Sequence, residues 1–565
     1  MFTDARRVPD GSVVETDVCI VGAGAAGITL AREFNGQRFR VALLESGGFD
    51  FDAETQSLYK GRTTGIPYFK LDEARLRFFG GTTNHWGGLC RPFDPIDFEP
   101  RPGVPWTGWP IRRSDLDGFY PRAAQIVHLT ASNWSIRYWS RRDNSSPIST
   151  GRRVLSRLVQ IVPPVFRSFG TTYRSEIDRS RNVVSYLHAN VTEIDTDEAA
   201  RTATHVRVAT LSGTRFSVAA RLFIVAVGGI ENPRLLLASN RTQRSGLGNQ
   251  HDLVGRFFLE HPRFRAGVLV PLEENLSTRF YEPHRAGKGE IEGYLAPTDD
   301  VKQSERLVDV QIRLDPLTSD VFAPRDIAAL RGLLGTGSPT DEHIEGFGRQ
   351  VELIARDLGT WHRFVVPGSL LPVPYPDVLG KLARSSRLER RALIPALFGD
   401  IAAFSYEKVS GRPLTAGIGL TTRISPAPNP DSRVTLMSTR DRIGMPRAQL
   451  NWELSPIDRR SVIRTLEIFG AAVGAAGIGR VRIVFDEDAR SWPTDTAGGW
   501  HHMGTTRMSD NPKLGVVDAN CKVHGTTNLF IAGSSVFATG GSGTPTLTLV
   551  ALALRLAGHV KRIMA

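Results

Sequence analysis

A glycine-rich turn between two short apolar runs constrains the fold of this chain more than any other stretch. The first run has the length of a buried parallel strand and is too short for a helix. The order is strand, G-x-G-x-x-G turn, helix, strand and acid, which predicts a βαβ unit that binds a dinucleotide. Its parts are the strand 18–21, the glycines Gly22, Gly24 and Gly27, the helix 28–34, the strand 41–44 and Glu45.

The chemistry of a dinucleotide explains why these residue types occur together. Glycines let the backbone approach a pyrophosphate, which the amide groups and the dipole at a helix N-terminus attract. Glu45 can accept hydrogen bonds from both ribose hydroxyls, and its charge would repel a 2′-phosphate. A tight turn that binds nothing would not need the acid.

Length and composition limit the class of protein. A chain of 565 residues exceeds one simple core, so two domains are expected. No apolar run reaches the roughly 18 residues of a membrane span, and residues 1–15 lack an apolar signal-peptide core. Cys19, Cys90 and Cys521 show neither a disulfide framework nor metal-ligand spacing. We therefore predict a cytoplasmic protein without a metal.

The net charge of +12 could attract nucleic acid, acidic lipids or an acidic partner. The basic residues are mostly scattered arginines, and they are densest between residues 137 and 157. Because no nucleic-acid motif accompanies them, we expect a solvated basic surface and no nucleic-acid partner.

Two further segments carry chemistry. Two Gly-Gly pairs bracket residues 82–86, which include His85 and Trp86, and this tight loop favours the wall of a flat ligand. Near the C-terminus, a short strand 529–532 ends in Gly533, and an apolar helix 546–560 follows. Thr544 can cap that helix and Pro545 can be its first residue. The buried helix N-terminus would present free N–H groups and positive charge.

Adjacent His501 and His502 precede Met503-Gly504-Thr505. On an extended segment, neighbouring side chains point in opposite directions, so only one of them can face a bound ligand. Imidazole titrates near neutrality and suits removal of a hydroxyl proton. Both histidines could instead simply hydrogen-bond within the core.

The GAGAAG turn with its acid, the GGTTNHWGG loop and the C-terminal segment together resemble the glucose–methanol–choline (GMC) family of FAD-dependent oxidoreductases. Bacterial sugar and polyol dehydrogenases and pyranose-oxidase-like members are the most similar. The resemblance implies an α/β, Rossmann-like FAD-binding domain and an α+β substrate domain with an antiparallel sheet. The FAD-binding domain would comprise 1–115, 183–262 and 498–565, and the substrate domain 116–182 and 263–497.

The resemblance also implies a reaction. An alcohol group of a sugar, glycoside or polyol would lose a hydride to flavin N5, while His501, the first His of H-x-x-G-T, acts as general base. His502 would support it. In some members a His after the Gly-Gly turn is covalently joined to the flavin; His85 holds that position, and covalent and non-covalent binding both stay open.

The resemblance implies two sets of site residues in this sequence, the catalytic residues and the FAD contacts. The catalytic prediction is His501, His502 and Thr544. Thr544 stands where most members have His or Asn, and its hydroxyl can hydrogen-bond a substrate oxygen but cannot act as a base. The predicted FAD contacts are Gly22, Gly24, Ala25, Ala26, Gly27, Glu45, Ser46, Gly80, Gly81, Thr82, Asn84, His85, Val191, Gly533, Ser534, Thr544, Pro545 and Thr546.

Several elements are predicted from periodicity. Strands at 183–187, 192–194, 204–210 and 215–218 would form a small antiparallel sheet. Other predictions are a helix 114–127 capped by Ser114, a strand 222–227 followed by a helix 234–239, a helix from Ser455 to about residue 475, and helical spacing over 323–397. His251 and His261 are interpreted as structural.

Three rival functions share part of this evidence. An oxidase that reduces O2 to H2O2 has every motif, and we favour instead a dehydrogenase with a quinone or a protein-bound haem as electron acceptor. A nicotinamide-linked dehydrogenase would not need the C-terminal segment. Because of Thr544, a flavin-bound subunit with weak or no catalysis is also considered. Co-export with a partner subunit would place the protein in the periplasm.

Overall fold

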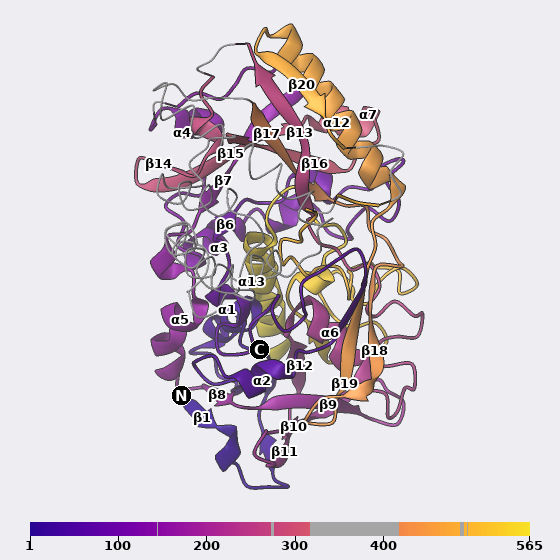
Figure 1. Cartoon of the computed structure of the whole chain (residues 1–565). Coiled ribbons are helices and arrows are strands. Elements are labelled where there is room, and N and C mark those ends of the chain that lie inside the picture. Colours follow the sequence, from indigo (N-terminus) through magenta and orange to yellow (C-terminus); the bar gives the residue numbers. More distant parts are fainter. Residues whose placement is uncertain (144, 273–275, 317–416, 486–490, 494) are drawn as a thin grey trace, which may run out of the picture.

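The computed structural model describes residues 1–143, 145–272, 276–316, 417–485, 491–493 and 495–565. The chain forms two parts, one around a parallel sheet and one around an antiparallel sheet (Figure 1). The predicted helical stretch 323–397 lies outside the described residues. The predicted domain limits stay a prediction.

The lower part in Figure 1 is built on a six-stranded sheet in which all neighbouring strands are parallel. β3 and β4 are fully buried apolar strands, as expected when helices cover both faces of a parallel sheet. The strand order is β1 (Phe2–Asp4), β8 (Val183–Leu187), β4 (Val41–Leu44), β3 (Val18–Val21), β12 (Leu222–Val225) and β21 (Leu529–Ile531).

Two smaller sheets flank this core. The first has the order β2 (Val13–Glu15), β11 (Arg215–Ala219), β10 (Ala203–Ala209) and β9 (Asn190–Thr196). The prediction that strand 183–187 belongs to this sheet was wrong, because β8 pairs in parallel with β4 and β1. The second has the order β18 (Arg433–Arg440), β19 (Pro446–Trp452) and β5 (Arg62–Gly65), so it joins segments nearly 400 residues apart.

The upper part is an antiparallel sheet with one apolar and one polar face. Alternate residues such as Phe264, Ile312 and Leu420 pack against helix α12 (Pro456–Ala475), whereas Gln311 and Arg423 lie on the other face, toward the first part. The order is β20 (Gly479–Ile483), β13 (Arg263–Pro271), β17 (Ile418–Ser425), β16 (Asp309–Pro316), β15 (Gly289–Pro297), β7 (Val154–Ile161) and β6 (Leu89–Cys90), with β14 (His284–Ala286) beside β15.

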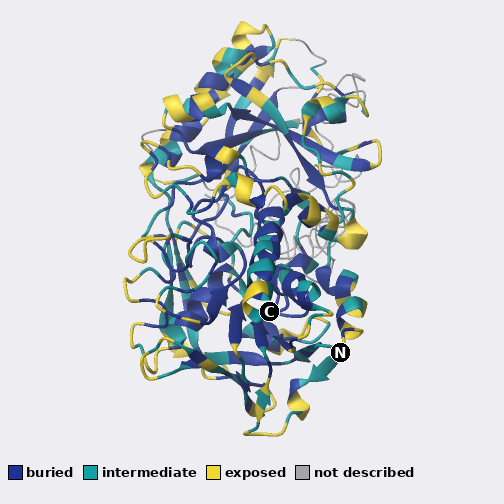
Figure 2. Cartoon of the chain, turned by 180° about the vertical axis from the view of Figure 1, so that it is seen from behind, coloured by how far each residue is buried: buried dark blue, intermediate teal, exposed yellow. Residues whose placement is uncertain are grey.

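Helix α13 (Pro545–Met564) is buried over most of its length and packs beside α1 (Ala25–Phe34) and α3 (Tyr120–Ile126). Figure 2 colours much of this central helix dark blue. Its N-terminus points toward the junction of the two parts. The remaining described α-helices are α2 (Ala53–Ser57), α4 (Ile136–Ser140), α5 (Phe169–Asp178), α6 (Gly228–Ala238) and α7 (Asp299–Ser304).

Two helix predictions need correction. Residues 114–127 do not form one helix capped by Ser114: a 3-10 turn, Arg113–Leu116, stops before Gly118 and α3 begins at Tyr120. α6 begins at Gly228, not at residue 234, although it contains Pro233. Proline cannot donate to the carbonyl four residues earlier, and that carbonyl, of Gly229, accepts the Thr505 hydroxyl at 2.6 Å instead.

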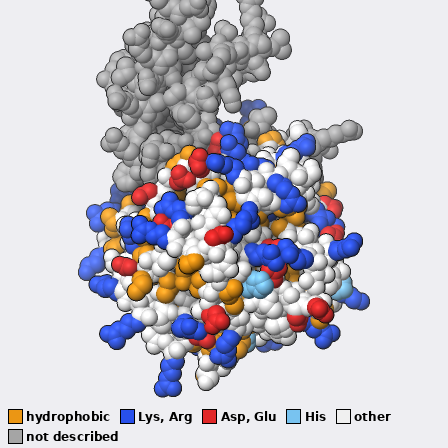
Figure 3. Space-filling view, turned by 90° about the horizontal axis from the view of Figure 1, so that it is seen from below, with side chains coloured by type: hydrophobic (Ala, Val, Ile, Leu, Met, Phe, Trp, Pro, Cys, Tyr) orange, Lys and Arg blue, Asp and Glu red, His pale blue; other side chains and the backbone are white. Residues whose placement is uncertain are grey.

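On one face of the molecule the charged side chains are not gathered into a single patch. On the face shown in Figure 3, Lys and Arg side chains stand among acidic, apolar and uncharged ones. Within the described residues, no helix is long and apolar enough to cross a membrane, and no three His, Cys, Asp or Glu residues gather as metal ligands.

Candidate active site

The glycine turn combines two packing glycines with one that faces open space. Gly22 has φ +100, and a Cβ there would lie 2.7 Å from the Ala226 carbonyl oxygen. A Cβ on Gly27 would lie 1.8 Å from the Gly22 oxygen. Gly24 is the N-cap of α1, and a Cβ on it would meet no atom of the described residues within 4 Å. The N-terminus of α1 is thus exposed to a cavity.

Glu45 follows β4, next to this turn, and it is 6% exposed. Its two carboxylate oxygens accept the backbone N–H groups of Ala23 at 2.9 Å and Gly47 at 3.0 Å. Burial raises the pKa of this carboxyl, and the two N–H groups partly offset that effect. Each oxygen keeps a lone pair for a further donor, such as a ribose hydroxyl.

One elongated cavity runs from the N-terminus of α1 to the N-terminus of α13. Two helix N-termini and a buried acid around one slot fit a dinucleotide with an anionic pyrophosphate. Among the predicted residues, its wall includes Gly22, Gly24, Ala25, Ala26, Glu45, Ser46, Gly81, Thr82, Val191, His501, His502, Gly533, Ser534, Thr544, Pro545 and Thr546.

Four predicted FAD contacts are not on the wall. Gly27 packs against Gly22, and a Cβ on Gly80, which has φ +97, would overlap the Gly170 backbone. The Asn84 side chain is bonded to the Ser168 hydroxyl and the Phe79 carbonyl. These three residues shape the wall from behind, as does His85.

His85 lies behind the indole of Trp500. The two rings are stacked, with centroids 4.7 Å apart and an interplanar angle of 13°. Burial lowers the pKa of His85 to about 4, and neither ring nitrogen has a hydrogen-bond partner among the described residues. Trp500, at φ 60, lines the cavity in its place. A bond from His85 to flavin would need this stack to open, and the covalent link stays a prediction.

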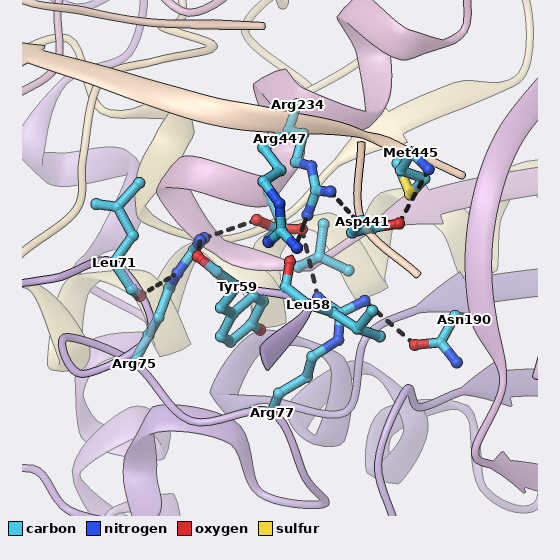
Figure 4. A network of polar contacts seen from close by, with 12 residues as sticks. Leu58, Tyr59, Leu71, Arg75, Arg77, Asn190, Arg234, Asp441, Met445 and Arg447 are labelled. Carbon is cyan, nitrogen blue, oxygen red and sulfur yellow. Dashed lines mark hydrogen bonds and ion pairs between the residues drawn. The ribbon is translucent and has the colours of Figure 1, made fainter. Parts of the chain in front are cut away.

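A buried ion cluster lies beside the cavity, and Figure 4 shows its residues Arg75, Arg234 and Asp441. Glu231 accepts Arg75 at 2.9 Å and Arg234 at 2.9 Å, and Arg234 also pairs with Asp441 at 2.6 Å. These pairs hold the pKa of Glu231 down to about 2 despite burial. The cluster links α6, the segment before the Gly-Gly loop and the turn between β18 and β19. Glu231 lines the cavity.

His501 is a neutral imidazole on the cavity wall. Its backbone N–H donates to both oxygens of Glu260, at 3.0 and 3.1 Å, and its Nδ1 lies 2.8 Å from Nδ1 of His261. Burial holds the pKa of His501 well below 6.5, and His261 and two nearby arginines act in the same direction. A neutral imidazole can accept a proton at pH 7.

His502 also lines the cavity. Its Nε2 lies 3.0 Å from the Tyr68 hydroxyl, which donates to Glu260 at 2.5 Å. The His502 carbonyl accepts the Ser534 hydroxyl at 2.7 Å, so this extended segment is fixed to the turn after β21. Burial likewise holds the pKa of His502 well below 6.5.

Thr544 is the N-cap residue of α13, as predicted, but its side chain is bonded to β6. Its hydroxyl donates to the Leu89 carbonyl at 2.5 Å, and it makes no side-chain cap to α13. Because the hydroxyl donates its one hydrogen to the Leu89 carbonyl in β6, it cannot also donate to a substrate oxygen. The helix N-terminus itself, at Pro545 and Thr546, still faces the cavity.

Sequence reasoning did not place three residues in this site. His261 was interpreted as structural, but it touches His501. Glu260 and Tyr68 join the two histidine systems. The only sequence feature that could have indicated them is Glu260-His261-Pro262, just before β13. It does not show which distant residues these side chains contact.

Comparisons with known proteins found similar chains. A family model described as GMC oxidoreductase matches residues 428–553. The chain is 24% identical to the 2-methyl-1,2-propanediol dehydrogenase of Mycolicibacterium austroafricanum over 98% of this chain and 96% of that one. It is also 24% identical to the 6'''-hydroxyparomomycin C oxidase of Streptomyces lividus over 95% of this chain and 90% of that one.

The fold is similar to that of a solved oxidase. The structure of pyridoxine 4-oxidase from "Mesorbium loti" aligns with a TM-score of 0.50 and 16% identity, covering 96% of this chain and 98% of that one. The cavity in this fold suits a dinucleotide cofactor. The chain resembles the GMC oxidoreductases over its whole length, and these comparisons support the predicted family resemblance, fold class and FAD cofactor.

Proposed function

We propose that this enzyme oxidises an alcohol group of a polyol, sugar or glycoside to a carbonyl, with His501 as the general base. The observation that carries the proposal is the neutral, anchored imidazole of His501 on the wall of the cofactor cavity. The dehydrogenase and the oxidase compared above support the substrate class, because their names denote a diol and a hydroxylated aminoglycoside.

The residues that would hold FAD follow from the cavity. The turn from Gly22 to Gly24 and the N-terminus of α1 would hold the pyrophosphate, and Glu45 the ribose. The N-terminus of α13, at Pro545, would lie at the flavin edge, where its dipole favours the negative charge of the reduced form. FAD, when bound, supplies an acceptor for the two-electron hydride.

The protein would supply the proton chemistry. The alcohol O–H bond breaks as its proton moves to His501, the C–H electron pair leaves as hydride, and the carbonyl forms. Glu260 fixes the His501 backbone, so the imidazole does not need to reorient during the reaction. His502 would form the neighbouring wall, held by Tyr68.

Replacement of His501 tests this role. We expect His501→Ala to keep FAD and to slow anaerobic flavin reduction about a hundredfold or more. A matched control is His251→Ala, because His251 is exposed and outside the cavity. Reduction by His501→Ala at the wild-type rate would remove His501 from the role of base.

The electron acceptor separates a dehydrogenase from an oxidase. We propose a dehydrogenase that passes electrons to a quinone or a protein-bound haem, with an O2-dependent oxidase as the second candidate because one full-length relative is named an oxidase. Mixing the reduced enzyme with air decides between them. Reoxidation over minutes supports the dehydrogenase, and reoxidation within a turnover time with release of H2O2 supports the oxidase.

A further inference from the structure

His261 and His501 form a hydrogen-bonded pair of imidazoles, of which His501 lines the cavity. Their Nδ1 atoms are 2.8 Å apart, and the rings are nearly perpendicular, at 88°. His261 is 2% exposed, and burial and the neighbouring Arg423 lower its pKa to about 3. Both rings are therefore neutral at pH 7, and one of the two Nδ1 atoms must carry the hydrogen that they share.

The base role proposed for His501 decides which nitrogen carries it, because Nε2 of His501 must be free to accept the alcohol proton. The Nε2 atom of His261 faces the Gly540–Gly541 turn, where a Cβ on Gly540 would lie only 3.0 Å away. Nε2 has no hydrogen-bond partner among the described residues, and the backbone of Gly540 and Gly541 raises the pKa of this ring slightly against the effect of burial. A hydrogen on Nε2 leaves a lone pair on Nδ1 of neutral His261. His501 must then donate from its own Nδ1.

We propose that His261 is a positioning residue that holds His501 in the tautomer with hydrogen on Nδ1 and a free lone pair on Nε2. This inference rests on the proposed function, because only that tautomer lets Nε2 accept the alcohol proton. When the O–H bond breaks and the Nε2–H bond forms, the charged ring keeps its Nδ1–H bond to His261. No proton passes to His261, and it does not touch the substrate.

His502 provides an internal contrast. The Tyr68 hydroxyl has one hydrogen, which it donates to Glu260 at 2.5 Å, so it can only accept from Nε2 of His502. Neutral His502 therefore carries its hydrogen on Nε2. Two adjacent histidines are held in opposite tautomers by different partners.

A pair of substitutions separates positioning from packing. His261→Phe keeps a ring of similar volume but removes the acceptor, whereas His261→Asn loses volume but places a carbonyl oxygen near the old Nδ1 position. If His261 positions His501, Phe slows flavin reduction about 100-fold with little change in substrate affinity, and Asn stays within about tenfold of wild type. If His261 only fills space, Asn is the worse variant and the proposal fails.

A spectroscopic readout tests the tautomer without turnover. In 15N-histidine-labelled protein carrying FAD but no substrate, long-range ¹H–15N spectra report which ring nitrogen is protonated. We expect hydrogen on Nδ1 of His501 and on Nε2 of His502, and we expect His261→Phe to change only the former. Hydrogen on Nε2 of His501 in wild type, or an unchanged His501 in His261→Phe, would overturn the inference.

The spectrum also distinguishes this inference from the proposed function. A protein with the expected tautomers whose flavin no alcohol or sugar reduces would refute the function and leave the His261 assignment intact. A protein that oxidises alcohols with His501 protonated on Nε2 would refute the His261 assignment and leave alcohol oxidation as the function. FAD content and the thermal midpoint, measured for each variant, show that the fold is retained, and His251→Phe serves as the histidine control.

Discussion

Two glycines three residues apart should respond to alanine in opposite ways. A Cβ on Gly27 would lie 1.8 Å from the carbonyl oxygen of Gly22, so α1 or the turn must move by more than about 1 Å. The Gly22 backbone cannot yield easily, because its N–H is bonded to Leu44 at 2.7 Å. Overpacking of this kind costs about 3 kcal/mol.

Gly24→Ala should leave the fold almost unchanged. Gly24 has φ −84 and ψ −164, which an L-residue adopts, and the added Cβ meets no described atom within 4 Å. The lower entropy of the unfolded chain and the poorer N-cap nearly cancel, so stability should change by less than about 1 kcal/mol. The methyl group would instead occupy the space that the pyrophosphate needs, and FAD affinity should fall at least about tenfold.

Urea unfolding of the FAD-free protein measures stability, and FAD titration measures affinity. Gly118→Ala, in an exposed turn with open space around it, is the matched control for both. Equal destabilisation by Gly24→Ala and Gly27→Ala would refute the division of roles. So would wild-type FAD affinity in Gly24→Ala.

Three further outcomes are expected. Asp441→Ala leaves the buried Arg234 without one of its carboxylates, and it should cost about 3–5 kcal/mol in urea unfolding; a loss below about 1 kcal/mol contradicts this. Tyr68→Phe removes the acceptor of His502 Nε2–H and should slow flavin reduction about tenfold at unchanged FAD content, and an unaltered rate argues against the link. Because the pKa of His501 is lowered, its imidazole is neutral above pH 6.5. The rate of flavin reduction should therefore be constant from pH 7 to 8 and fall only at lower pH. A half-maximal rate at or above pH 7 would contradict this.

The sequence predicted the parts of the site that are local in the chain. The strand, turn and helix around Gly22 follow from apolar runs and from backbone conformations that only glycine adopts. The start of α12 followed from Ser455 and Asp458, which form a capping box. Such signals act within a few residues, so they need no knowledge of the tertiary structure.

The misread parts depend on contacts between distant segments. His261 and His501 are 240 residues apart, and Tyr68 and Glu260 are 192 apart, so no spacing rule could pair them. The Thr544 hydroxyl is occupied by Leu89 for the same reason. β8 was assigned to the wrong sheet because alternating apolar residues do not show which neighbour a strand will pair with.

The most direct test of the account is the oxidised-flavin absorbance of the purified protein, followed without oxygen as polyols, sugars and glycosides are added one at a time. We expect a yellow protein that loses this absorbance with at least one hydroxyl-bearing compound, at a rate that depends on His501. A yellow protein whose spectrum none of these compounds changes would contradict it.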